Sequence, residues 1–211
     1  MSAGHDEGGR VPTMTTRAAQ PRLETPDLLL RSLVPGDASA VVRICSDKRV
    51  AAFTRTIPHP YSPADAEAFI LRVSAGWEAG TGAVFAICER WADGVESDPI
   101  GTVGVMIDTI DVRGEIGYAI APESWGKGYA TQAAAAFCGW CFDSLGLRKL
   151  TAHHMAHNAA SARVLQKIGF RHEGVLRAQA FKWGVAHDLV ATGVLREEWT
   201  AATRPGVETT R

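Results

Sequence analysis

Two glycines stand where an expected strand, Glu115–Ala121, leads through a short loop into an expected helix that begins at Tyr129. Glycine lets a backbone approach a ligand closely, and the first amides of a helix have no intrahelical acceptor. With the helix dipole, these amides favour an anion such as a pyrophosphate. No G-x-G-x-x-G fingerprint is present, because Thr131 replaces its third glycine, and no Gly-Lys-Ser/Thr phosphate loop follows. Gly126 and Gly128 predict a phosphate cradle of another kind, although a turn that merely enters a helix has the same pattern.

Glu115 is a candidate general base. On a strand it shares one face with Gly117 and Ala119, which leaves the carboxylate uncrowded. Such a carboxylate can remove a proton from a nucleophile, directly or through water. A solvated carboxylate, or an ion pair with the neighbouring Arg113, accounts for the same residue equally well.

Asn158 and Ser161 lie one turn apart at the start of an expected helix, Asn158–Ile168, so both side chains can face the same point. Asn158 is also a good helix cap, and Ser161 is an ordinary first-turn residue. The residues alone leave both interpretations open.

Two of the four cysteines form a C-x-x-C pattern, Cys138 and Cys141; the others are Cys45 and Cys88. Redox pairs usually lie at a helix N-terminus, where the dipole lowers the thiol pKa. This pair falls past the middle of an expected helix, Tyr129–Leu145. We therefore predict buried thiols and neither a redox pair nor a disulfide framework.

Three histidines lie close together, at His153, His154 and His157. On a strand, His153 and His154 point to opposite faces, and no cysteine or carboxylate completes a ligand set. We predict no metal site, and we expect His154 or His157 to line a cleft.

The elements that must position these residues alternate in type. Residues 1–22 and 201–211 have no apolar period and predict a disordered arm and a flexible tail around one domain, 23–200. The expected elements are strand Asp27–Leu33, a helix from Asp37 as cap to Ser46, a helix with Ser62, Pro63 and Asp65 at its start and Gly80 at its end, strands Ala83–Glu89, Ile100–Asp108 and Glu115–Ala121, helix Tyr129–Leu145, strand Lys149–His154, helix Asn158–Ile168, and strands Glu173–Lys182 and Asp188–Glu197. Turn-rich links such as Asp93-Gly94 predict antiparallel pairing.

Composition sets the broad class. The chain has 211 residues, 46% of them apolar, and a formal net charge of -1. This balance argues against a protein held mainly by nucleic-acid phosphates or by anionic lipid. No apolar stretch approaches the ~20 residues that span a bilayer, and residues 1–20 lack the apolar core of a signal peptide. We expect a cytoplasmic protein with neither a nucleic-acid nor a membrane partner.

The segment from Gly114 to Thr131 resembles the GNAT N-acetyltransferase superfamily, most of all the branch that acetylates ribosomal-protein N-termini (alanine or serine). Asn158–Phe170, followed by Glu173-Gly174, resembles that branch's helix after the fifth strand, and Asp188–Trp199 resembles its terminal strand. The likeness covers roughly Leu23 to Trp199. One departure concerns the loop, which in the superfamily often opens with Gln or Arg. Glu123 stands there, and Lys127 is expected to supply positive charge instead.

The resemblance implies a GNAT fold of the α+β (mixed α/β) class. Its sheet is twisted and mostly antiparallel, with about 6–7 strands flanked by about 4 helices. The fourth and fifth strands, Glu115–Ala121 and Lys149–His154, are expected to splay apart.

The resemblance also implies acetyl-CoA as cosubstrate and no metal. The pyrophosphate would lie on the amides of Gly126–Ala130, and the pantetheine arm would pair with the backbone near Tyr118–Ile120. Asn158 would hold pantetheine or a water, and Ser161 would donate toward the departing sulfur. The donor-binding residues expected in this way are Tyr118, Ala119, Ile120, Gly126, Lys127, Gly128, Tyr129, Ala130, Thr131, Asn158 and Lys167.

We therefore expect an acetyl-CoA-dependent N-acetyltransferase that works by direct attack in a ternary complex, with Glu115, Ser161 and Asn158 as its catalytic residues. The leading acceptor is a protein N-terminal amine. A small-molecule amine (polyamine, amino acid or antibiotic) is the alternative, and a non-catalytic acyl-CoA-binding module is a third hypothesis. The first two helices and the terminal hairpin should shape the acceptor side, where the candidates are Arg55, His59, Lys182 and Trp183. A monomer and a homodimer are both compatible with the sequence.

Overall fold

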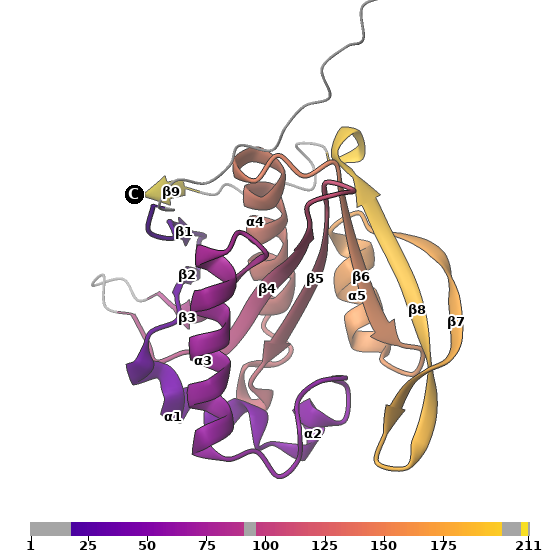
Figure 1. The fold of residues 1–211 in the computed structure, drawn as a ribbon, viewed down its shortest axis with the longest axis horizontal. Helices are drawn as coiled ribbons and strands as arrows, with labels where there is room; N and C mark the ends of the chain where they lie inside the picture. Colours follow the sequence, from indigo (N-terminus) through magenta and orange to yellow (C-terminus); the bar gives the residue numbers. More distant parts are fainter. Residues whose placement is uncertain (1–17, 91–95, 200–207, 211) are drawn as a thin grey trace, which may run out of the picture.

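The computed structural model of the protein describes residues 18–90, 96–199 and 208–210, and the fold is a single open sheet with helices on both faces (Figure 1). Within the described residues the strand order is β7-β8-β6-β5-β4-β3-β2-β1-β9. The strands are β1 (Arg22–Glu24), β2 (Leu28–Ser32), β3 (Gly82–Glu89), β4 (Gly101–Asp108), β5 (Arg113–Ile120), β6 (Lys149–Met155), β7 (Arg171–Lys182), β8 (Val185–Leu195) and β9 (Glu208–Thr210). The helices are α1 (Ala38–Cys45), α2 (Lys48–Ala51), α3 (Pro63–Glu78), α4 (Tyr129–Ser144) and α5 (Ala159–Lys167).

The pairing between β5 and β6 is short. It is parallel and joins only Arg113–Glu115 to Lys149–Thr151, whereas the other neighbouring strands of the described sheet pair antiparallel. Beyond Glu115 the two strands separate, as Figure 1 shows. The predicted mixed α+β sheet with a splayed fourth and fifth strand is confirmed.

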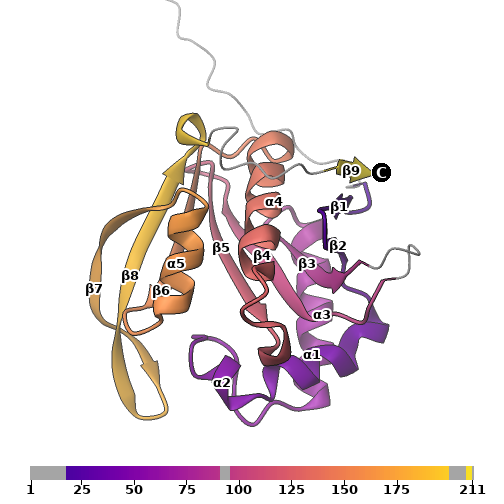
Figure 2. The ribbon, with the colours of Figure 1, turned by 180° about the vertical axis from the view of Figure 1, so that it is seen from behind.

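Helices α1 and α3 lie on one face of the sheet, and α4 and α5 lie on the other (Figures 1 and 2). On β5, Ile116, Tyr118 and Ile120 face the cluster that α4 completes. The alternate residues, Glu115 and Gly117, therefore face the side of α1 and α3. Any side chain of β5 can be assigned to one face by this alternation.

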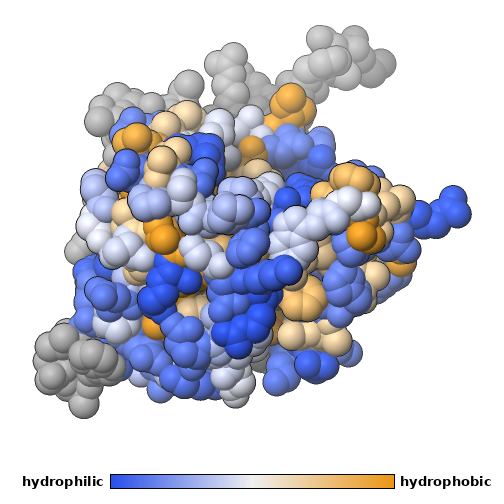
Figure 3. Space-filling model, turned by 90° about the horizontal axis from the view of Figure 1, so that it is seen from below, coloured by the Kyte–Doolittle hydropathy of each residue, from blue (hydrophilic) through white to orange (hydrophobic). Residues whose placement is uncertain are grey.

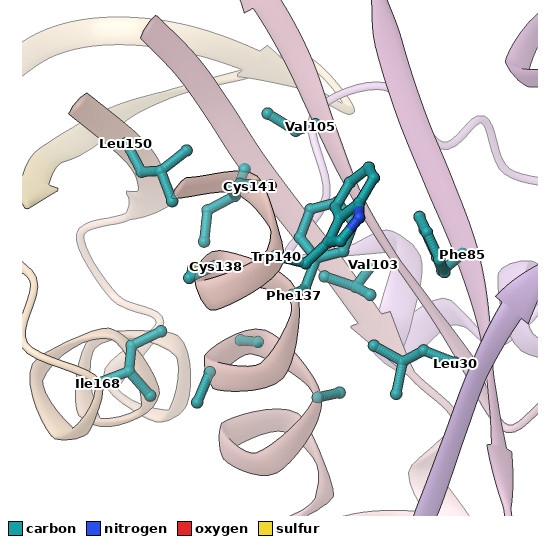
Figure 4. Close-up of a cluster of buried hydrophobic side chains, with 14 of the residues drawn as sticks. Leu30, Phe85, Val103, Val105, Phe137, Cys138, Trp140, Cys141, Leu150 and Ile168 are labelled. Atoms are coloured by element: carbon teal, nitrogen blue, oxygen red, sulfur yellow. The ribbon is translucent and has the colours of Figure 1, made fainter. Parts of the chain in front are cut away.

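The core lies between α4 and the sheet (Figure 4). Phe85 of β3 meets Phe137 and Trp140 of α4 with ring centroids 5.5 and 5.1 Å apart, in edge-on arrangements. Residues Ala133–Ala136 are buried and small, which lets the helix approach the strands closely. Burial of each large side chain contributes about 1.5–3 kcal/mol. The core fixes the N-terminus of α4 against the end of β5.

Local signals account for the start of α3. Ser62 Oγ accepts from Asp65 N, Asp65 Oδ2 accepts from Ser62 N, and Pro63 occupies the first helical position. The sequence predicts Ser62 as the cap, Pro63 at the first position and Asp65 in the first turn; the return bond from Ser62 N to Asp65 completes a capping box.

Asp37 precedes α1 as expected, but its side chain makes no cap hydrogen bond. Its two carboxylate oxygens accept from Arg31 at 2.8 and 2.9 Å, and one of them also accepts from Val34 N. The predicted cap is wrong because a charge-assisted, two-pronged bond to Arg31 is stronger than a bond to a helix amide.

Several short elements were not predicted, namely β1, α2 and β9. β9 pairs with β1 and lies inside the expected tail, while residues 200–207 and 211 are outside the described residues. Residues 1–17 of the expected arm and the Asp93-Gly94 turn are also outside the described residues. Ala18, which is described, accepts a hydrogen bond from Trp77 Nε1 through its carbonyl oxygen. None of the described helices has the length and apolar character to span a membrane.

Candidate active site

A cleft of about 1020 Å³ opens where β5 and β6 separate. Its walls contain every expected catalytic and donor-binding residue except Lys127. Residues of α2 and of the loop before α4 line it as well, and these lie at the lower end of the molecule in Figure 1. Figure 3 views that end and shows a mainly hydrophilic surface with hydrophobic atoms between. Residues from distant parts of the chain thus share one cavity.

The glycine turn, Gly126–Gly128, forms one end of the cleft. Gly126 and Gly128 have φ of +79° and +84°, and a Cβ on either would meet no atom within 4 Å. Both glycines are therefore needed for backbone conformation, and both border open space. The first hydrogen bond of α4 runs from Gln132 N to Gly128 O at 3.1 Å. The amides before Gln132 point out of the helix end, as an anion site requires.

Charge near the turn differs from the expectation. Lys127 Nζ lies 3.2 Å from Glu89 Oε1 and 5.4 Å from the Tyr129 ring centroid, and Lys127 does not line the cleft. Glu123 forms an ion pair with Arg43, which compensates its charge. The positive charge on the cleft wall comes from other residues, namely Arg49, Arg55, Arg72, Arg163 and Lys167.

Among the described strands, none pairs with the edge of β5 beyond Glu115 on the β6 side. Tyr118, Ala119 and Ile120 lie along this edge and line the cleft. Trp125 Nε1 donates to Ile120 O at 2.8 Å, which ties the glycine turn to the strand end. An unpaired edge offers backbone groups to an extended ligand in the way that a further strand would use them.

At the start of α5, Asn158 Oδ1 accepts from Ser161 N at 3.1 Å, so the side chain caps the helix. The Tyr118 hydroxyl lies 2.9 Å from Ser161 Oγ and 3.3 Å from Ser161 O. Burial raises the pKa of Tyr118 to about 12, so the phenol keeps its proton at neutral pH. A chain of two hydroxyls therefore links β5 to α5 inside the cleft.

Glu115 and His153 meet on the opposite face of the sheet. Glu115 Oε1 lies 3.1 Å from His153 Nδ1, at an ion-pair distance but without hydrogen-bond geometry. Their side chains are 32% and 24% exposed, so both are within reach of the cleft and of water. Arg113 pairs with Asp108 and Asp111, so the alternative that made it the partner of Glu115 is wrong.

The acceptor-side candidates are distributed differently. Arg55 lines the cleft, whereas His59 and Trp183 contact each other with ring centroids 5.8 Å apart. Lys182 is buried and donates to the carbonyls of Thr54 and Ile57, and burial lowers its pKa. Lys182 thereby fastens the tip of hairpin β7–β8 to the loop that carries Arg55.

The cysteine pair and two of the histidines lie in different surroundings. Cys138 and Cys141 are fully buried on α4 (Figure 4), and burial raises the pKa of both thiols. His154 and His157 line the cleft. Across the described part of the chain, no three His, Cys, Asp or Glu side chains gather as metal ligands would.

A family model described as "Acetyltransferase (GNAT) domain" matches residues 27–171. The chain is 32% identical over 173 residues to "Uncharacterized N-acetyltransferase YoaA" of Bacillus subtilis, covering 80% of this chain and 93% of that protein. It is 30% identical over 178 residues to "Uncharacterized N-acetyltransferase p20" of Bacillus licheniformis, covering 84% and 97%.

Solved structures share the fold. Mycobacterium smegmatis RimJ in complex with CoA-disulfide superimposes with a TM-score of 0.74 at 23% identity, covering 86% of this chain and 90% of that one. The ribosomal-protein-S5-alanine acetyltransferase from Vibrio fischeri gives 0.71 at 22%, covering 85% and 98%. Spermidine N-acetyltransferase from Vibrio cholerae, in complex with CoA and spermine, gives 0.69 at 24%, covering 82% and 97%. Enzymes named for protein and for polyamine acceptors are thus similar to this chain to nearly the same degree.

Proposed function

The chain belongs to the GNAT acetyltransferase family, and from this premise we propose that it transfers the acetyl group of acetyl-CoA to the N-terminal α-amine of a protein. The observation that carries the proposal is the cleft itself. It runs from an open glycine turn, along an unpaired strand edge, to a carboxylate beside the opening between β5 and β6.

The donor end of the cleft fits acetyl-CoA. Gly126 and Gly128 leave open space at a helix N-terminus, where phosphates are favoured. The strand edge at Tyr118 and Ala119, before the Ile120 carbonyl that Trp125 occupies, is available to an extended arm. Arg163 and Lys167 on α5 add positive charge. Acetyl-CoA would supply a thioester, whose carbonyl carbon is the electrophile for an amine.

The chain's own residues handle the protons. The amine must lose a proton as its nitrogen bonds to the acetyl carbon, and the carbon–sulfur bond breaks with the electron pair going to sulfur. Glu115 is placed to accept the proton, directly or through water. Ser161, held by Tyr118, is placed on the α4–α5 face to donate toward the sulfur. Glu115 and Ser161 thus lie on opposite faces of the sheet, and both line the opening where β5 and β6 separate.

An α-amine is the acceptor that demands least of this site. Its pKa of about 7.7–8.0 leaves a sizeable neutral fraction near pH 7, whereas a lysine-like amine near 10.4 is almost wholly protonated. Glu115 is partly exposed, and a carboxylate of that kind suits proton transfer through water. Peptides and proteins with a free N-terminus are therefore the preferred substrates.

A thiol-release assay with acetyl-CoA tests the proposal. The acceptors are peptides with N-terminal alanine or serine, the same peptides blocked at the N-terminus, free amino acids, spermidine and an aminoglycoside. We expect thiol release with the unblocked peptides and an acetylated α-amine by mass spectrometry. Calorimetric binding of acetyl-CoA with no acceptor-dependent release would instead indicate a binding module.

A further inference from the structure

The part of the cleft on the α1–α3 face forms a groove that we call the acceptor groove. Its floor consists of Gly104, Met106, Glu115 and Gly117, and its wall on α3 contains Phe69 and Arg72. Gly104 and Gly117 are opposite each other on β4 and β5, and a Cβ on Gly117 would meet no atom within 4 Å. Met106 is 60% exposed. A flat, partly apolar floor therefore lies beside Glu115.

The charges around the cleft are unequal. Of the described residues that line it, five are lysine or arginine (Arg49, Arg55, Arg72, Arg163, Lys167), and two are carboxylates, Asp65 and Glu115. Asp65 is engaged in the cap of α3, where Oδ2 accepts from Ser62 N at 2.8 Å and from Ser62 Oγ at 2.6 Å. Glu115 is the carboxylate that remains for the reacting amine.

The basic residues divide between the two ends of the cleft. Arg163 and Lys167 lie on α5 with Ser161, at the donor end. Arg49 lies 5.7 Å from the Trp125 ring centroid beside the glycine turn and forms an ion pair with Asp47. Arg72 lies on the groove wall, where its guanidinium stacks 5.5 Å from the Phe69 ring centroid. Arg55 lies in the loop that Lys182 fastens. Within the described part of the chain, neither Arg55 nor Arg72 forms an ion pair.

We infer that the amine acceptor carries an anionic group close to its reacting amine, which Arg72 and Arg55 attract; this inference rests on the proposed function. For a protein N-terminus the anionic group is an aspartate or glutamate among the first residues. A guanidinium binds a carboxylate with two parallel hydrogen bonds, and both arginines have this capacity free. A polyamine would bring further ammonium groups toward two arginines, and of the described cleft residues only Glu115 and Asp65, which caps α3, carry a carboxylate.

The experiment uses two C-terminally amidated peptides with the same N-terminal residue. One has aspartate at its second and third positions, and the other has lysine there. The kcat/KM of both is measured for wild type, Arg72→Glu, Arg55→Glu and Arg177→Glu at low and high ionic strength. Arg177 is an exposed arginine on β7 that does not line the cleft, so it controls for the change in net charge.

We expect wild type to prefer the acidic peptide about tenfold, which corresponds to about 1.4 kcal/mol. Arg72→Glu and Arg55→Glu should each reduce this ratio several fold, Arg177→Glu should not, and salt should shrink it. Equal rates on both peptides in wild type, or a ratio that neither arginine variant changes, would overturn the inference and leave acetyl transfer established. If no peptide is acetylated at all, the proposed function is what fails.

Discussion

The hydroxyl of Tyr118 lies 2.9 Å from Oγ of Ser161, although the two residues are 43 positions apart in the chain. This contact joins β5 to α5 beyond Glu115, where the pairing of β5 with β6 has ended. It gives Ser161 a fixed partner and a neighbouring proton. The position of Ser161 toward a departing sulfur therefore depends on a tyrosine of another element.

Removal of either hydroxyl should slow turnover through the same defect. Ser161→Ala is expected to lower kcat about 10–100-fold, and Tyr118→Phe about 5–10-fold, because groups that act as a unit share their effect. The double variant should then be little slower than Ser161→Ala. Because the pKa of Tyr118 is about 12, Tyr118→Phe should lower the pH profile below pH 9 without changing its shape. Losses that multiply in the double variant would show that the two hydroxyls act independently.

The glycine turn allows a matched test of donor binding. Gly128 and Gly146 both have positive φ, +84° and +67°, and a Cβ on either meets no atom within 4 Å, but only Gly128 lines the cleft. Aspartate at either position should therefore cost about 1–2 kcal/mol of backbone strain. Gly128→Asp should abolish acetyl-CoA binding in calorimetry, whereas Gly146→Asp should bind like wild type.

A folding control accompanies that comparison. Wild type should gain ~2.7 kcal/mol of stability at a donor concentration of 100 times Kd, and Gly146→Asp should gain the same. Undiminished binding by folded Gly128→Asp would exclude the turn as the phosphate site.

Two lysines should differ in their effect on the donor. Lys127 faces Glu89 and the Tyr129 ring outside the cleft, whereas Lys167 lines it. Lys167→Met is expected to weaken acetyl-CoA binding about 2–5-fold, with the loss shrinking at high salt, as for an exposed charge. Lys127→Met should change Kd by less than about twofold. The reverse order in a titration would mean that Lys127 turns toward the phosphates.

The cysteines of α4 should be inert. Cys138 and Cys141 are fully buried and burial raises the pKa of both, so neither forms a reactive thiolate at neutral pH. A thiol reagent should label them only as fast as the protein unfolds. Replacement of both by alanine should cost stability, since buried thiols pack as small apolar groups, and should leave turnover per folded molecule within a few fold. Loss of turnover with unchanged folding would contradict this.

The fold was predictable wherever the signals are local. The start of α3 at Ser62 and Pro63 was predicted from adjacent residues, and the antiparallel pairing of β3 with β4 and of β4 with β5 was predicted for strands that follow one another in the chain. By contrast, β1, α2 and β9 are three or four residues long. β1 pairs with the neighbouring β2 and with β9, which comes from the other end of the chain. No residue in β5 or β6 predicts that the two strands separate, so this feature was expected only from the family resemblance.

In the candidate site, too, local features were predictable and contacts between distant residues were not. Positive φ at Gly126 and Gly128 follows from residue type, and the cap at Asn158 follows from position. Contacts between side chains of different strands do not follow from residue type or position in this way. Glu115 faces His153 rather than its neighbour Arg113, because the parallel register of β5 and β6 brings Thr151 beside Glu115 and His153 close after it. The contact of Lys127 with Glu89 was not predicted, because a glycine turn leaves the direction of its side chains undetermined.

Proton removal by Glu115 is the central claim, and the pH dependence of kcat/KM with one peptide acceptor tests it most directly. General-base contributions are typically ~10²–10⁴-fold. Glu115→Gln should therefore lower kcat/KM by ~10²–10⁴-fold and weaken the rising limb of the profile, with acetyl-CoA affinity nearly unchanged. The acceptor titrates over the same range, so wild type and variant must be compared on the identical peptide. A variant that keeps both the wild-type rate and the wild-type pH dependence would show that Glu115 is only a strand carboxylate beside His153.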